Sequence, residues 1–154
     1  MERYIGLDLG TTTVGIAISD VLGIVHGREN FCFERGNYKK AREHIINLLN
    51  EEKINKVVVG LPLMPNGEEQ TRCESTKRFM NDILKELPTL EVIYEDERFS
   101  TIEAKERMIN MNMKKSKSEN LIDMFSAIII LERYLRRIEN GTKWKPNCNL
   151  WWRW

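Results

Sequence analysis

The chain has 154 residues, the length of about one ordinary domain, which favours a single hydrophobic core. Its 24 lysines and arginines nearly balance its 23 aspartates and glutamates, and 42% of the residues are hydrophobic. This composition excludes a disordered polyelectrolyte and a membrane-embedded protein. The net charge of +1 also argues against binding nucleic acid through bulk positive charge, although a local basic face can coexist with an acidic pocket.

Three features indicate a cytoplasmic protein without membrane contact. The longest apolar stretch, residues 124–131, is interrupted by Ser126 and is far shorter than the roughly 18 to 20 residues that cross a bilayer. The first residues lead directly into a strand pattern and lack the regions of a signal peptide. Cys32, Cys73 and Cys148 are odd in number and widely separated, which favours free thiols over a disulfide framework or a zinc site.

The first part of the chain predicts three strands and a helix. Residues 4–9 and 14–19 are mostly apolar and are joined by a turn at residues 10–13, which is typical of a hairpin. Residues 23–34 contain enough alternating apolar positions for a third, less regular strand. Residues 37–52 repeat apolar side chains at helical spacing and predict an amphipathic helix.

The second part of the chain predicts alternating strands and helices. Residues 56–62 form a β-branched run that ends in a proline, typical of a central parallel strand buried on both faces. A helix is expected over residues 70–87 and a strand over residues 90–95. Two helices follow, separated by a polar, lysine-rich linker, over residues 101–110 and 118–139.

The resulting order, βββαβαβαα, defines the expected fold. The first three strands form an antiparallel half and the later strands a parallel half, because helices connect them. We therefore expect an α/β protein with a mixed five-stranded sheet and helices on both faces, the element order of the RNase H-like fold. No internal repeat appears, so we expect one domain over residues 1–140 and a tail at residues 141–154 that holds all four tryptophans.

Asp8 is a carboxylate in the middle of an apolar strand, where an unpaired buried charge is costly. A structural explanation is that Asp8 accepts hydrogen bonds from the turn that contains Thr11 and Thr13. A metal site is the sharper explanation, because carboxylate oxygens are ligands for hard cations.

Two further acidic features occupy informative positions. The run of three acids at residues 95–97 stands at the carboxyl end of a predicted parallel strand, where ligands of open α/β sheets gather. The run could instead be an acidic turn before the next helix, because Ser100 or Thr101 with Glu103 resembles an N-terminal cap. Asp123 lies near the start of the most apolar helix, where it could be a ligand or interact with the helix dipole. In the expected fold the three acidic positions converge on one end of the sheet, which suits Mg²⁺ and phosphodiester hydrolysis.

Four motifs in this order resemble the YqgF (RuvX) family. They are residues 8–20 (DLGTTTVGIAISD), 59–62 (VGLP) with 66–67 (NG), 96–101 (DERFST), and 122–123 (ID) before an apolar helix. The resemblance spans roughly residues 3–138. The chain departs from the family pattern at Thr13, where an Arg is usual, and at Phe99 and Ser100, where Leu and Thr are usual.

The resemblance implies an RNase H-like endonuclease that matures the 5′ end of pre-16S ribosomal RNA, or a Holliday-junction resolvase that acts on branched DNA. By motif match, Asp8, Glu97 and Asp123 take the positions of the family's proposed catalytic, metal-binding carboxylates. The implied cofactor is Mg²⁺, or Mn²⁺ in its place. Glu97 would follow a strand two spacings from that of Asp8, on the order of 9 to 10 Å at the backbone, so its side chain has to reach inward.

The first motif also resembles the phosphate-binding turn of the actin, sugar-kinase and heat-shock ATPase superfamily. Those proteins consist of two RNase H-like halves that close over a nucleotide, and 154 residues supply only one half. Length therefore favours the nuclease family.

The expected partner is nucleic acid, either precursor rRNA or branched DNA, with a ribosomal particle as a further candidate and a monomer or homodimer as the assembly. Basic residues could position its sugar-phosphate backbone, or could simply form a solvated surface. They are Arg72, Lys77, Arg78, Arg98, Lys114, Lys115 and Lys117. The tail could stack on single-stranded bases, pack on the domain or mediate self-association. A non-catalytic protein that binds structured RNA is the alternative to an enzyme.

Overall fold

A computed structural model describes residues 2–62 and 72–139, and within them the element order is the expected βββαβαβαα. The strands are β1 (Ile5–Leu9), β2 (Thr13–Ser19), β3 (Val25–Cys32), β4 (Lys56–Leu61) and β5 (Glu91–Asp96). The helices are α1 (Tyr38–Glu52), α2 (Arg72–Glu86), α3 (Ser100–Asn110) and α4 (Lys115–Glu139). The pair at residues 66–67 and the predicted tail at residues 141–154 lie outside the described residues.

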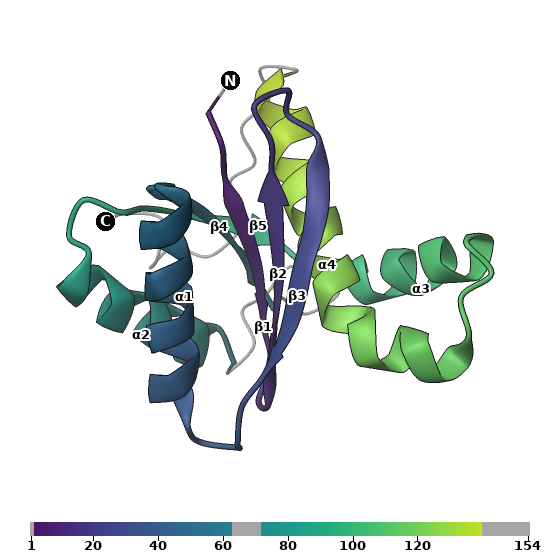
Figure 1. Ribbon diagram of the computed structural model, residues 1–154, viewed down its shortest axis with the longest axis horizontal. Helices are drawn as coiled ribbons and strands as arrows, with labels where there is room; N and C mark the ends of the chain where they lie inside the picture. The colour runs from purple at the N-terminus through teal and green to yellow at the C-terminus, as the bar shows by residue number, and fades with distance from the viewer. Residues whose placement is uncertain (1, 63–71, 140–154) are drawn as a thin grey trace.

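The five strands form one mixed sheet in the order β3-β2-β1-β4-β5. β1, β2 and β3 pair antiparallel, whereas β4 pairs parallel with both β1 and β5. Helices α1 and α2 cover one face and α4 covers the other, while α3 and the first turns of α4 extend together away from the sheet (Figure 1). The predicted fold class is therefore confirmed. No helix in the described parts of the chain is long and apolar enough to span a membrane.

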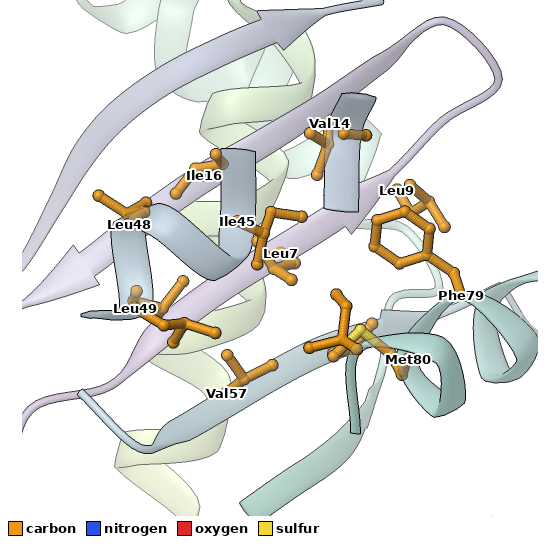
Figure 2. Close-up of a cluster of buried hydrophobic side chains, with 14 of the residues drawn as sticks. Leu7, Leu9, Val14, Ile16, Ile45, Leu48, Leu49, Val57, Phe79 and Met80 are labelled. Carbon is orange, nitrogen blue, oxygen red and sulfur yellow. The ribbon is translucent and has the colours of Figure 1, made fainter. Parts of the chain in front are cut away.

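The face of the sheet toward α1 and α2 packs large aliphatic side chains. Alternate residues of each strand point to this side, as the two-residue period of a strand requires. These strand side chains form one buried cluster with side chains of α1 and α2. The members labelled in Figure 2 are Leu7, Leu9, Val14, Ile16 and Val57 from the sheet, and Ile45, Leu48, Leu49, Phe79 and Met80 from the helices. Complete burial of one such side chain contributes about 1.5 to 3 kcal/mol, so this cluster forms a principal hydrophobic core of the domain.

The opposite face has a second apolar cluster, in which Tyr4 and Val58 pack against α4, and glycines let this helix come close to the sheet. A Cβ atom at Gly6 would lie 2.9 Å from the Cβ atom of Leu131, and one at Gly15 would overlap the backbone carbonyl of Asp123. Gly15 pairs with Asp8 in the neighbouring strand. The glycines therefore let the backbone of α4 rest on β1 and β2 beside Asp8.

Helix α4 begins three residues before its predicted start. The segment at residues 115–117, expected as linker, forms the first turn of this helix. Asp123 consequently lies in the third turn. The explanation that Asp123 interacts with the helix dipole is wrong, because that effect is confined to the first turn. The other described boundaries differ from the predicted ones by at most two residues.

Candidate active site

The three predicted acids line a single pocket of about 530 Å³ at the carboxyl ends of the parallel strands. Asp8 comes from β1, Glu97 directly follows β5, and Asp123 comes from α4. The structure therefore brings together three carboxylates that are far apart in the sequence.

Glu97 reaches Asp8 across the intervening strand because that strand has a glycine at the crossing point. Strand β4 lies between β1 and β5. A Cβ atom at Gly60 of β4 would lie 2.6 Å from Oε2 of Glu97 and 3.1 Å from its Cβ atom. The side chain of Glu97 thus passes over Gly60, and its carboxyl group hydrogen-bonds to that of Asp8. The two-strand separation expected from the sequence is real, and Gly60 provides the path across it.

Asp8 and Glu97 form a strongly perturbed pair. Burial raises the pKa of the Asp8 carboxyl well above its usual value, and the neighbouring Glu97 and Asp123 raise it further. Burial also raises the pKa of Glu97, against the lowering effects of the hydrogen bond to Asp8 and the charge of Arg72. Two acids in hydrogen-bond contact titrate as a unit, and they share a proton unless a cation offsets their charge.

Asp123 stands beside this pair and is held by Thr13. The Thr13 hydroxyl at the start of β2 donates a hydrogen bond to Oδ2 of Asp123. The end of the first turn therefore contacts Asp123. Across residues 2–62 and 72–139, no three His, Cys, Asp or Glu side chains converge as a complete metal-ligand group. The observed arrangement is an acid pair with a third acid next to it.

Two of the seven predicted basic residues also line this pocket. Nη2 of Arg72, at the start of α2, donates to the carbonyl oxygen of Leu9 at 2.7 Å, and its charge lowers the pKa of both Asp8 and Glu97. Arg98 pairs with the Asp96 carboxylate at 2.7 Å. Arg72 therefore supplies positive charge directly to the acid pair, whereas Arg98 lies at the rim with its charge partly offset.

The other five basic residues are not brought to the carboxylate pocket. Lys77 lines a separate pocket between α2 and β5, and Arg78 is exposed on α2. Lys114, Lys115 and Lys117 are exposed where α3 meets α4. These three lysines form a basic tip on the part of the domain that extends away from the sheet.

The turn that carries Glu97 is tied to α4 by Arg133. Nη1 of Arg133 donates to the carbonyl oxygens of Asp96 and Arg98, at 3.2 and 2.9 Å. Its Nη2 donates to Glu103 in α3 at 2.6 Å. One guanidinium group thus holds the backbone on both sides of Glu97. One turn further along α4, Arg137 forms an ion pair with the buried Glu95.

Three contributors to the pocket were missed by sequence reasoning: Gly60, Thr13 as a partner of Asp123, and Phe99. A signal existed for Gly60, a glycine that interrupts a run of valines in a predicted central strand. Phe99 lines the pocket with 57% of its surface exposed. Its only signal was the replacement of the usual Leu of the family.

The strand order and the acids at the carboxyl ends of the parallel strands define an RNase H-like protein. RuvC of T. thermophilus, in complex with a Holliday junction substrate, superposes with a TM-score of 0.58 at 13% identity, covering 92% of this chain and 98% of RuvC. The yeast mitochondrial Holliday junction resolvase Ydc2 gives a TM-score of 0.50 at 10% identity, over 88% of this chain and 78% of Ydc2. At these identities the likeness establishes the fold alone.

The family described as "RuvX: Holliday junction resolvase" matches residues 2–137. A relative from Sulfurihydrogenibium sp. (strain YO3AOP1), named "Putative pre-16S rRNA nuclease", is 38% identical over 139 residues, 90% of this chain and 92% of the relative. A relative of the same name from Bacillus cereus (strain B4264) is 38% identical over 138 residues, 88% and 98% of the two chains. The chain therefore belongs to the RuvX (YqgF) family, as its motifs indicated.

Proposed function

We propose that this chain is a metal-dependent nuclease that hydrolyses phosphodiester bonds during 5′-end maturation of pre-16S rRNA. The observation that carries the proposal is the half-buried pair of Asp8 and Glu97 in an open pocket, with Asp123 beside it. Two partly desolvated acids in contact are costly to the fold, and a bound cation would offset that cost. The names of the relatives support the choice of substrate.

The chemistry of the donor set suits a hard divalent cation, although the three acids do not converge as a complete ligand group among the described residues. The oxygens of Asp8, Glu97 and Asp123 line a pocket with room for the water and phosphate oxygens that Mg²⁺ sites commonly retain. These three residues would hold Mg²⁺, or Mn²⁺ in its place. When bound, such a cation activates water and stabilises the leaving oxygen of a phosphodiester.

The remaining pocket residues position groups and balance charge. Thr13 orients Asp123 by binding one of its carboxylate oxygens, which leaves the other oxygen to act as a ligand. Arg72 would neutralise part of the charge of a phosphate that lies over the acid pair, because it already interacts electrostatically with both acids. Arg98, at the rim, would contact the backbone of a neighbouring nucleotide.

A parallel cleavage assay tests this proposal. The purified protein is incubated with Mg²⁺, with Mn²⁺ or with EDTA, on an rRNA fragment that contains the precursor 5′ end and on a four-way DNA junction. We expect metal-dependent cleavage of the RNA. Asp8→Asn, Glu97→Gln and Asp123→Asn should each reduce it more than about a hundredfold, since even partners of ligands contribute 10- to 100-fold. Asp82→Asn, on α2 away from the pocket, is the matched control and should retain activity.

Three other results would contradict the proposal. Undiminished cleavage by Asp8→Asn would remove the acid pair from the reaction. Cleavage of the junction alone would identify a resolvase that acts on DNA. Affinity for RNA without any metal-dependent product would favour the non-catalytic RNA-binding protein.

The basic tip is expected to contact the sugar-phosphate backbone of the same substrate. Replacement of Lys114, Lys115 and Lys117 by alanine should weaken RNA binding. It should also make the fall of log affinity with log salt shallower by about 2, because fewer phosphate contacts release fewer counterions. Fluorescence anisotropy over a salt series measures this slope. An unchanged slope would assign the three lysines to a solvated surface.

We also place the protein in the cytoplasm, with ribosomal particles as partners. Its assembly as a monomer or homodimer stays a prediction.

A further inference from the structure

Phe99 is a large aromatic side chain that the fold leaves at the mouth of the candidate active site. It follows Glu97 by two residues and lines the carboxylate pocket, with 57% of its surface exposed. It also lines the adjacent pocket that contains Arg98 and Arg133. Phe99 therefore borders two hollows of the surface, and more than half of its surface is exposed.

The backbone of Phe99 has a left-handed conformation, with φ of 65° and ψ of 4°. Residues other than glycine, asparagine and aspartate rarely adopt this conformation, which costs free energy of folding. Hydrogen bonds fix it on both sides. The amide of Ser100 donates to the carbonyl of Glu97 at 3.0 Å, and that of Glu103 donates to the carbonyl of Phe99 at 3.0 Å. Arg133 holds the carbonyl just before Phe99, at 2.9 Å.

Strained residues that are held in this way concentrate at functional sites. Phe99 lines the same pocket as Glu97, and Arg72 and Arg98 also line it, where they would offer positive charge to a bound phosphate. An aromatic ring next to a phosphate-binding pocket is the arrangement by which proteins hold single strands, with bases on the ring and the backbone on cations.

We propose that Phe99 stacks on the nucleobase next to the scissile phosphate, so that the strand is cleaved in an unpaired segment. The inference rests on the proposed function and adds the substrate class, a nucleic acid that is single-stranded at the cleavage site. Stacking requires an unpaired base, because in a duplex the face of each base is covered by its neighbours. A leucine, usual at this position in the family, lacks the π face that stacks.

Binding experiments with three residues at position 99 test aromaticity separately from size. The proteins carry Asp8→Asn to prevent cleavage and are titrated into labelled single-stranded RNA of about 12 nucleotides, a length within the range of single-strand binding sites. We expect Phe99→Leu to weaken binding about 5- to 100-fold and Phe99→Trp to preserve it. Leu22→Ala, an exposed apolar residue in the turn between β2 and β3, should have no effect.

A substrate with one base removed locates the stacked nucleotide. We expect an abasic nucleotide next to the cleaved bond to weaken binding to the protein with Phe99, and to have no further effect on the protein with Phe99→Leu. Additive losses from the two changes would overturn the proposal, because they would show that the ring and the base do not interact.

Further arms separate stacking from other roles of Phe99. The loss in Phe99→Leu should be similar for single-stranded RNA and single-stranded DNA, since stacking does not read the 2′-hydroxyl, and it should disappear for a full duplex. Melting temperatures of the three proteins should agree. Equal binding by Phe99→Leu, or an equal loss in Phe99→Trp, would overturn the proposal.

If cleavage disappears in Asp8→Asn while Phe99→Leu binds normally, only stacking fails. If Asp8→Asn still cleaves, the proposed function fails instead.

Discussion

Neighbouring residues of β2 meet opposite environments on the two faces of the sheet. Ile16 is fully buried among the aliphatic side chains under α1 and α2. Gly15 has no side chain, and the backbone of α4 occupies the space beside it. The first face stabilises the domain through large aliphatic side chains. The second face also has an apolar core, in which Tyr4 and Val58 pack against α4, but at its glycines the helix lies directly on the strands.

The candidate site uses that proximity. Asp123 reaches the pocket because α4 rests on Gly15, and Glu97 reaches Asp8 because Gly60 leaves a path across β4. Both approaches depend on the absence of a Cβ atom. The acids therefore lie on the face of the sheet where missing side chains let α4 and Glu97 come close to the strands, beside the apolar core that this face also contains.

The largest effect on stability should come from adding one methyl group to the face of the sheet that α4 covers. Gly15→Ala would force the backbone of α4 away from β2, and we expect it to lower the free energy of unfolding by about 3 kcal/mol, the upper part of the range for overpacking. Ile16→Val, on the opposite face, should cost about 1 kcal/mol. Urea unfolding of both variants measures the contrast. Equal costs would show that the close approach of α4 is not a constraint.

Gly60→Ala should separate activity from stability. The added methyl group would meet the ends of the side chains of Glu97 and Ile130, which can move, so the domain should fold. Glu97 would nevertheless be displaced from Asp8, and a shift of about 1 Å can reduce catalysis about a hundredfold. Val59→Ala on the other face should show the reverse, with lower stability and full activity at low temperature. Cleavage rates and melting curves test the pair, and full activity of Gly60→Ala would contradict the proposed path.

The smallest effect is a gain in stability from Asp8→Asn without metal. Because burial and neighbouring acids raise the pKa of Asp8 in the folded state, its stabilising contribution is complete below the unfolded pKa of about 4 and is lost as pH rises through the folded pKa. Asparagine does not titrate. We therefore expect the variant to be more stable at pH 7 by on the order of 1 kcal/mol, and to differ little near pH 4. Urea unfolding in EDTA at both pH values measures this, and a gain independent of pH would point to another cause.

The fold was predictable because each element carries its own pattern. The strands of the hairpin, the valine run of β4 and the amphipathic helices have periods that local sequence reveals. Asp8 was predictable for the same reason, as a charge in an otherwise apolar strand. The start of α4 was not, since residues 115–117 are polar and their helical state depends on packing of the following turns against α3.

The geometry of the site was less accessible to sequence. The contact between Thr13 and Asp123 joins residues 110 positions apart, and the path over Gly60 depends on which strands are neighbours. Lys77 and Arg78 are close to Arg72 in sequence, yet only Arg72 lines the carboxylate pocket, because a helix turns successive residues to different sides. Composition identifies basic residues, and the phase of the helix decides which of them can reach a substrate.

The ion pair between the buried Glu95 and Arg137 helps to fix the position of α4 along its own axis. It acts together with the apolar contacts that α4 makes with Tyr4 and Val58 of the sheet. Arg137 lies about four turns beyond Asp123, and Glu95 is only 2% exposed. A slip by one turn, about 5.4 Å, would leave this charge buried without its partner, which costs roughly 3 to 5 kcal/mol. The register of the third acid is thus set in part by a charge pair at the far end of the helix.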